Sequence, residues 1–529
     1  MSLTKEDIIN DLRALGVGPG MTIMAHSSLS SLGHVEGGAE TLIEALIEAV
    51  GPEGTVAMPA MPGSGVFDVE TSPSTVGTVT EVFRTYPGVK RSFHPSHSAC
   101  AIGPKADYLL ADTLQQPTAV GVESPWGRLS RLSEGYVLLL GVDQDRNTLL
   151  HHPEEIVRAP YLSTIERQYV DEHGNVQTKT LELFPGPHRD FIGLEPLLRE
   201  GRAMRIGKVG DAVARLMHAG TTVEIVVEAL REDPAAVLCD NPNCDDCVMQ
   251  RAKLKAHDLA QHDFTASALL DELVDDLRDA RDGGEWAGGM QAVWNEGVRA
   301  VELGEALGAQ LIEDQEARQG FLADLAEMEM SVSCLHCGLS AWDFVAQAEF
   351  VRARVVEAGE LARAMGAPLV KVPAPPPDTD PAAARARLGL ACEAAGDDVT
   401  VLFENTPGSI WDTGEACDAP LLGLADDYDV GFAFNPAHFA NVGEKPFLGT
   451  YRDTKLKRYT RIIYATDGCV PGRPQYTLPL EGNGEVKEVI SIFRARCFDG
   501  FVTLKMGDRR GPGEFRRQAE AFRRLLETS

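Results

Sequence analysis

The stretch from Val137 to Glu154, VLLLGVDQDRNTLLHHPE, indicates how the first half of the chain folds. Its apolar start is closed by Gly141, a pattern typical of a buried strand that ends at a site. After a polar turn, His151 and Glu154 stand three residues apart, which places both on one face if the segment is helical. An imidazole oriented by a carboxylate is the arrangement of a general base, although a surface or core histidine gives the same pattern.

Strand-like and helix-like segments alternate on both sides of this stretch, which predicts an α/β fold. Residues 22–25 form the first expected strand and 37–50 an amphipathic helix, so His26 and Ser27 lie at a strand end, where open α/β sheets bind ligands. Serine hydroxyls beside a helix N-terminus suit a pyrophosphate or pantetheine group, or they simply cap the helix. Further strands are expected at 54–59 and 178–184, and helices at 79–86, 106–114, 191–200, 211–218 and 223–231.

The length of 529 residues exceeds one ordinary core and predicts about two large domains or three to four small ones. The acidic segment 268–281 is expected to be a helix at the boundary, giving domains 1–264 and 265–529. The N-terminus resembles an amphipathic helix capped by Ser2 or Thr4, and no apolar run has the length of a membrane span. We therefore expect a cytoplasmic protein.

The charge balance is strongly acidic, with a formal net charge of −30. Such a surface repels nucleic acid and anionic membranes, so neither is expected as a partner. It attracts a polycationic substrate, and solubility explains it equally well.

Ten cysteines without an export signal are expected to be reduced thiols. Cys239, Cys244 and Cys247 have C-x4-C-x2-C spacing, and Cys334 and Cys337 flank a histidine. A structural zinc site needs four ligands, and neither cluster supplies four locally, so zinc binding stays open.

Four motifs in register carry a resemblance to a known family. They are the segments HSSLSSLG (26–33, with Val35 and two glycines following), RSFHPSHS (91–98), SPWG (124–127) and LLLGV followed by N-T-x-x-H-x-x-E (138–154). In this order, the first half resembles the aminoglycoside 3-N-acetyltransferase family from about Met1 to about Arg251. The resemblance implies an α/β domain that transfers an acetyl group from acetyl-CoA to an amine without a metal.

The resemblance also assigns roles to residues. His151 is the expected general base and Glu154 its orienting acid, with His152 as an alternative base because the His152-Pro153 pair departs from the family pattern. Acetyl-CoA is expected to contact residues of the first two motifs: His26, Ser27, Ser28, Leu29, Ser30, Val35, His97 and Ser98. An acidic cleft for a cationic amino-sugar is expected to include Asp68, Glu81 and Glu123.

In the second half, seven short strands alternate with helices, which predicts a (β/α)8 barrel whose missing strand precedes Trp286. The expected strands are 298–303, 331–336, 369–372, 399–403, 430–434, 462–465 and 500–504. From about Trp286 to Leu526 the chain resembles the xylose isomerase-like barrels of sugar isomerases, epimerases and endonucleases. That resemblance implies Glu404, His438 and Asp467 as ligands of a divalent metal. The chain departs from the family at Asn435, Tyr464 and Lys505, so the usual metal set is expected to be incomplete.

These observations favour an acetyl-CoA-dependent N-acetyltransferase acting on an aminoglycoside or a related amino-sugar or aminocyclitol. One alternative is a metal-dependent sugar isomerase or epimerase in the barrel. Another is a barrel that only binds carbohydrate or forms a homodimer.

Overall fold

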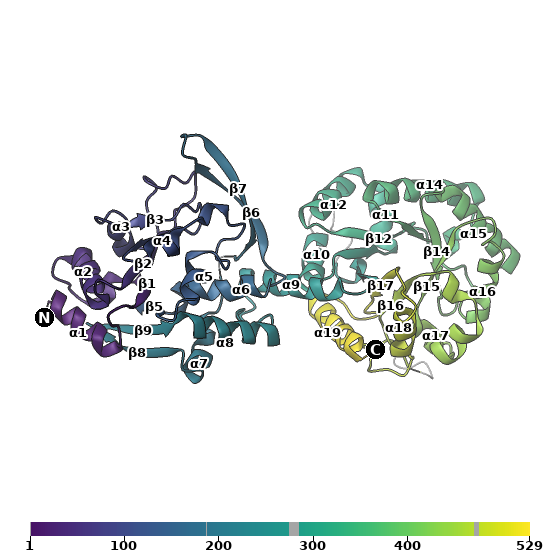
Figure 1. Ribbon diagram of the computed structural model, residues 1–529. Helices are drawn as coiled ribbons and strands as arrows, with labels where there is room; N and C mark the ends of the chain where they lie inside the picture. Colours follow the sequence, from purple (N-terminus) through teal and green to yellow (C-terminus); the bar gives the residue numbers. More distant parts are fainter. Residues whose placement is uncertain (1, 187, 275–284, 470–474, 529) are drawn as a thin grey trace. The chain divides into compact units, whose positions relative to one another are not determined.

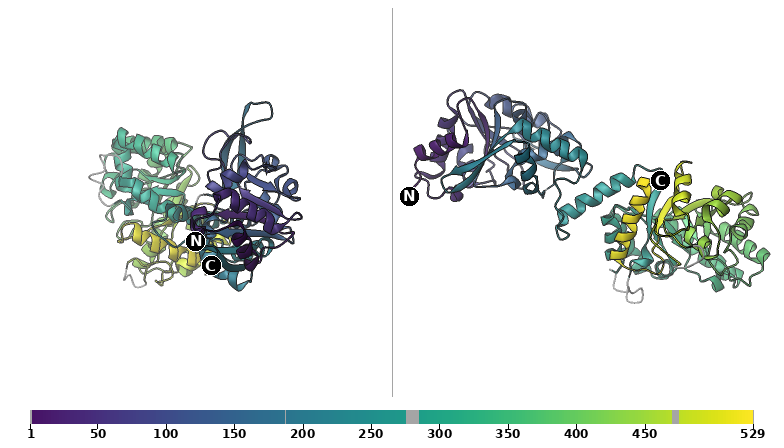
Figure 2. Two further views of the ribbon diagram at one scale, coloured as in Figure 1. Left: turned by 90° about the vertical axis from the view of Figure 1, so that its left-hand side faces the viewer. Right: turned by 90° about the horizontal axis from the view of Figure 1, so that it is seen from below.

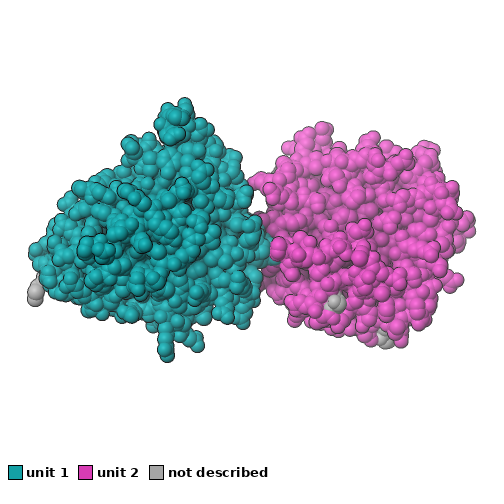
Figure 3. Space-filling view, viewed as in Figure 1, with its two compact units in different colours: residues 1–254 teal, residues 255–529 magenta. Residues whose placement is uncertain are grey.

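The computed structural model describes residues 2–186, 188–274, 285–469 and 475–528. The chain forms two compact units, Met1–Leu254 and Lys255–Ser529 (Figure 3). Within the described ranges, none of the helices has both the length and the apolar character that crossing a bilayer requires.

A mixed sheet forms the centre of the first unit (Figure 1). Its strands are β1 (Thr22–Ser27), β2 (Thr55–Pro59), β3 (Lys90–Arg91), β4 (Ala99–Ile102), β5 (Gly135–Leu140), β8 (Met204–Val209) and β9 (Ala212–His218). They lie in the order β3-β4-β2-β1-β5-β9-β8, with β1 parallel to both β2 and β5. Because Ser27 is in register with Leu140, the carboxyl ends of β1 and β5 lie side by side.

Helices cover both faces of this sheet, because successive side chains of a strand point to opposite sides. Leu138 and Leu140 pack into the core on one face, whereas Val137 and Leu139 pack into the core on the other. The first core is covered by α1 (Lys5–Leu15), α2 (Gly38–Val50) and α3 (Thr78–Arg84). Around the second core lie α4 (Ala106–Leu110), α5 (Pro125–Ser130), α6 (His152–Ile156), α7 (Glu195–Glu200), α8 (Ala219–Glu232) and the start of α9 (Asp245–Leu259). A separate ribbon of β6 (Ser163–Val170) and β7 (Val176–Phe184) projects from this unit (Figure 1).

The prediction of a helix at 211–218 was wrong, because this segment is strand β9. Its buried residues Ala212, Ala214 and Leu216 alternate with the more exposed Val213 and Arg215, which is the period of a strand. β9 pairs antiparallel with β5 and extends the sheet beyond the parallel strands.

The second unit is a closed barrel of eight parallel strands, which confirms the predicted fold. Figure 2 shows this unit from two further sides. Its strands are β10 (Thr265–Leu269), β11 (Ala300–Leu303), β12 (Ser331–His336), β13 (Leu369–Lys371), β14 (Thr400–Glu404), β15 (Val430–Phe434), β16 (Thr460–Tyr464) and β17 (Phe501–Leu504). Its helices are α10 (Glu285–Asn295), α11 (Glu305–Glu313), α12 (Gln315–Glu327), α13 (Ala341–Phe344), α14 (Ala348–Met365), α15 (Pro381–Ala395), α16 (Gly414–Leu422), α17 (Pro436–Asn441), α18 (Val486–Arg494) and α19 (Pro512–Thr528).

The missing strand before Trp286 is β10, so the prediction of a helix starting at residue 268 was wrong. β10 pairs with β11 and β17 and closes the barrel. Its small side chains suit the narrow interior, where the Ser267 hydroxyl lies 2.7 Å from that of Ser333. The rest of the expected helix, residues 275–281, lies outside the described residues.

Candidate active site

Two short 3-10 turns carry the chain from the end of β5 to the expected catalytic pair. The turns span Gln144–Arg146 and Thr148–His151, and α6 begins at His152. Pro153 therefore occupies the first turn of α6, where a helix needs no backbone N–H. The His152-Pro153 sequence, which departs from the family pattern, therefore fits the start of α6 without displacing His151 or Glu154.

His151 and Glu154 form the contact that the sequence predicts. The Nδ1 of His151 lies 2.7 Å from Oε2 of Glu154, and the Arg189 Nε donates to Oε1 at 2.5 Å. The Glu154 side chain is fully buried, whereas that of His151 is 17% exposed. Burial raises the pKa of Glu154, but the hydrogen bond from His151 and the charges of His151 and Arg189 outweigh it and hold the pKa below its usual value. The Phe191 ring packs edge-on against the imidazole, with 4.8 Å between centroids.

His152 lies in different surroundings from His151. Its ring is buried and its Nδ1 donates to the backbone carbonyl of Val120 at 2.7 Å. Burial lowers its pKa to about 4. His151 lines the adjoining cavity, whereas His152 is not among its lining residues.

Three hollows adjoin one another, and the central one is lined by His151. The central one, of about 500 Å3, is lined by His26, Ser27, Pro59, Met61, Thr75, Val76, Gly77, Thr80, His97, Val142, Asp145, Arg146, Thr148 and His151. A second, of about 760 Å3, shares Ser27 and Gly77 with it and extends along the loop before α2. A third, of about 670 Å3, shares Met61 and His97 with the central hollow and reaches the β6–β7 ribbon. His151 lines the central hollow, which shares lining residues with each of the other two.

Most residues expected to bind the coenzyme line these hollows. They are His26, Ser27, Ser28, Leu29, Ser30, Val35 and His97. Ser98 is not among them, because its buried hydroxyl donates to the carbonyl of Ala60 at 2.5 Å and accepts from the Arg91 Nε. Burial lowers the pKa of His26 to about 4, and its Nε2 has no hydrogen-bond partner within the described residues.

None of the three acids expected to bind the substrate lines the cavity. Asp68 accepts the backbone N–H groups of two following residues in a turn. Glu81 forms an ion pair with Arg84, and Glu123 forms ion pairs with Arg128 and Arg131. Two acids that sequence reasoning did not single out line the hollows instead: Asp145 and Glu166.

Arg189 is a third residue of the site that the sequence pattern did not indicate. It is buried, its guanidinium lies over the Tyr161 ring at 5.0 Å, and it holds the carboxylate of Glu154. Arg189 is 35 residues from Glu154 in the sequence and lies in a segment without a recognisable motif. The hydrogen bond between the two side chains therefore becomes apparent only in the folded structure.

In the barrel, polar side chains gather at the carboxyl ends of the strands, around a hollow of about 430 Å3. The Glu404 carboxylate accepts from the Lys505 Nζ at 2.7 Å and from the Asn435 amide at 2.7 Å. His438 lies beside it, with 3.2 Å between Nδ1 and Oε1. Lys371 contacts Glu302 and Glu404 from the other side.

The structure brings Glu404 and His438 together but does not place Asp467 with them as a third metal ligand. The Asp467 carboxylate accepts the backbone N–H groups of Gly468, Gly482 and Gly484. Across the ranges that the structure describes, the one group of ligand side chains with metal-binding spacing lies elsewhere, in the first unit.

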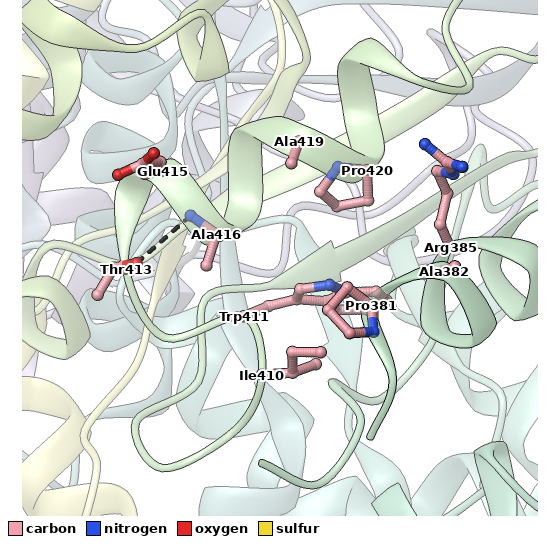
Figure 4. A pocket seen from close by; sticks show the side chains of 10 residues that line it. All are labelled: Pro381, Ala382, Arg385, Ile410, Trp411, Thr413, Glu415, Ala416, Ala419 and Pro420. Atoms are coloured by element: carbon pink, nitrogen blue, oxygen red, sulfur yellow. Dashed lines mark hydrogen bonds between the residues drawn. The ribbon is translucent and has the colours of Figure 1, made fainter. Parts of the chain in front are cut away.

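The barrel has a further hollow of about 570 Å3 beside the starts of α15 and α16 (Figure 4). Thr413 caps α16 there by accepting the N–H of Ala416. Of its lining residues, only Arg385 and Glu415 are charged, so the hollow carries no acid-base or nucleophilic arrangement.

Comparison with known proteins gives the family of the first unit. The family model for aminoglycoside 3-N-acetyltransferase matches residues 24–231. Aminoglycoside N(3)-acetyltransferase IV of Salmonella sp is 37% identical over 240 residues, covering 44% of this chain and 90% of that protein. The chain belongs to the aminoglycoside 3-N-acetyltransferase family. It is therefore an acyltransferase.

A further relative agrees with this family membership. The aminoglycoside N(3')-acetyltransferase-like protein YokD of Bacillus subtilis is 36% identical over 250 residues, which cover 42% of this chain and 90% of YokD. The solved structure of AAC-IIIb with CoASH is 28% identical and covers 44% of this chain and 97% of its own, with a TM-score of 0.41. The acetyltransferase unit is fused to a second domain, because the model for xylose isomerase-like TIM barrels matches residues 290–525.

Proposed function

We propose that the first unit transfers the acetyl group of acetyl-CoA directly to an amine of an aminoglycoside or a related amino-sugar. This proposal rests on the His151–Glu154 contact of 2.7 Å, because His151 lines the central hollow of the three. Membership of the acetyltransferase family supports the same reaction.

The proposed step needs a base, because a sugar amine is mostly protonated in water. With its Nδ1–H donating to Glu154, His151 carries its lone pair on Nε2 and takes a proton from the amine. The neutral nitrogen attacks the thioester carbonyl carbon and loses its second proton as the carbon–sulfur bond breaks. The sulfur of coenzyme A leaves and takes up that proton, and His151 gives its own proton to solvent. No covalent enzyme intermediate is required.

We assign acetyl-CoA to the hollow along the loop before α2. The N-terminus of α2 presents backbone N–H groups there without a side-chain cap, and the serine hydroxyls of residues 27–30 lie beside them. Free N–H groups at a helix start favour phosphate oxygens. The amine substrate then enters through the hollow beside the β6–β7 ribbon, where Glu166 and, deeper, Asp145 are the proposed contacts for its ammonium groups.

The test is a screen of aminoglycosides and simpler amines for release of free coenzyme A thiol by the full chain. We expect release with at least one cationic amino-sugar, together with a product heavier by one acetyl group. A folded chain that binds acetyl-CoA but releases no thiol with any acceptor would contradict the proposal.

For the barrel, we propose a metal-independent site for a polyhydroxylated ligand. Lys505 lies 2.7 Å from Glu404, so a cation of the chain already balances the carboxylate that a metal would otherwise contact. Titration calorimetry with simple sugars in the presence of a chelator should detect binding that Lys505→Ala abolishes and Lys455→Ala, at an exposed lysine, retains. Binding that requires a divalent metal would favour the isomerase alternative instead.

A further inference from the structure

Four potential metal ligands from distant parts of the first unit converge on one point. They are His188, Cys239, Cys244 and Cys247, whose ligand atoms all lie within 4.8 Å of one another. The Nδ1 of His188 is 3.3 Å from the sulfur of Cys247 and 3.4 Å from that of Cys244. The chain therefore supplies the fourth ligand that the C-x4-C-x2-C spacing lacks.

We propose that these four side chains bind a structural zinc ion. Three thiolates and one imidazole are a usual ligand set for zinc in proteins. With ligand bonds of about 2.0 to 2.3 Å, the ligand atoms of a tetrahedral zinc lie about 3.5 to 3.8 Å apart, close to the distances from His188. Four protein ligands leave no position for substrate, so the metal serves the fold and not the chemistry.

The local backbone is arranged as zinc-binding loops are. Cys244 directly precedes α9, and its carbonyl accepts the first hydrogen bond of that helix, from Val248. Cys247 lies in the first turn of α9, three residues after Cys244. Cys247 is fully buried, and all three cysteines are free thiols.

The site connects to the catalytic pair through one peptide unit. Arg189 follows His188 and donates to its carbonyl at 2.6 Å, while its Nε holds Glu154. A metal on His188 would fix this loop against the start of α9 and so keep Arg189 beside Glu154. Arg189 is thus a positioning residue, and this consequence rests on the proposed function, whereas zinc binding does not.

Metal analysis of the purified full chain tests the proposal directly. We expect about one zinc per chain, retained through dialysis. Cys244→Ser and His188→Ala should lose it, His188→Cys should keep it by restoring a fourth ligand, and Cys497→Ser, at an exposed cysteine of the barrel, should keep it as the matched control. Less than a tenth of one zinc per chain after incubation with zinc would overturn the proposal, as would unchanged zinc in folded Cys244→Ser.

A second readout uses the native sequence, in case the variants fail to fold. Exchange of the metal for Co2+ should give the visible absorption of a tetrahedral, thiolate-bound cobalt ion. Modification of the thiols should release the metal in step with the loss of that absorption. Cobalt spectra without thiolate character, or a disulfide among the three cysteines of the freshly purified chain, would contradict the site. Neither readout depends on acetyl transfer, so failure of the zinc site and failure of the proposed function are distinguishable.

Discussion

At the level of single residues, two neighbouring buried acids are held in different protonation states. Glu154 is buried between two cationic or hydrogen-bonding partners that hold its pKa below the usual value, so it stays ionised beside His151. Its neighbour Glu155 is also buried; its Oε1 accepts the backbone N–H of Val120 at 2.8 Å, and its Oε2 has no hydrogen-bond partner within the described residues. Burial raises the pKa of Glu155 to about 7.

This difference predicts how stability changes with pH. Because the folded pKa of Glu155 lies above the ordinary value of 4.5, the folded chain holds a proton that the unfolded chain has lost between pH 4.5 and 7. The contribution of protonated Glu155 to the free energy of unfolding is fully present below pH 4.5, and it is lost as the pH rises through 7. Glu155→Gln should therefore gain stability relative to the native chain between pH 5 and pH 8, by up to about 3 kcal/mol.

Denaturant unfolding of the two proteins at both pH values measures this change. Glu53→Gln, at an exposed glutamate, is the control and should show no such trend. A stability difference for Glu155→Gln that is the same at pH 5 and pH 8 would contradict the buried, protonated state.

At the scale of elements, the site depends on how closely β5 approaches the loop after β1. Gly141 ends β5 with a φ of +66°, and a Cβ there would lie 2.4 Å from the Cβ of Ser31. Gly174, in the β6–β7 turn, also has a positive φ, but a Cβ there would meet nothing within 4 Å. Gly174→Ala should cost about 1 kcal/mol of backbone strain, whereas Gly141→Ala should cost about 2 to 4 kcal/mol because overpacking is added.

Unfolding free energies and acetyl-CoA affinity measure this pair of variants. Ser31 donates to the hydroxyl of Ser28 at 2.8 Å, so Gly141→Ala should also weaken coenzyme binding, and Gly174→Ala should not. Equal effects of the two substitutions on stability and binding would show that the close approach is unimportant.

The elements also show what the sequence could predict. Buried strands such as β5 and β15 were predicted because their apolar runs are short and end at glycine or polar residues. β10 and β9 were missed, since the first is made of small residues and the second follows a charged turn that also suits a helix. His151 and Glu154 are close in sequence and were found together, whereas Arg189 and His188 reach the site only through tertiary contacts.

At the scale of the whole molecule, the chain separates into two units that each have their own core. A fragment of residues 1–264 includes all of the first unit and the whole of α9. We expect it to fold and to bind acetyl-CoA with the affinity of the full chain, measured by calorimetry. A folded fragment without affinity for acetyl-CoA would show that the barrel contributes to the coenzyme site.

In the proposed reaction, His151 removes a proton from the acceptor amine. The most direct measurement is kcat/KM for coenzyme A release by His151→Ala, with His173→Ala, at an exposed histidine of the β6–β7 turn, as the matched control. Loss of a general base costs about 100- to 10,000-fold in rate, so we predict a fall of at least about 100-fold for His151→Ala and none for the control. Turnover by a folded His151→Ala chain equal to that of the native protein would contradict the claim.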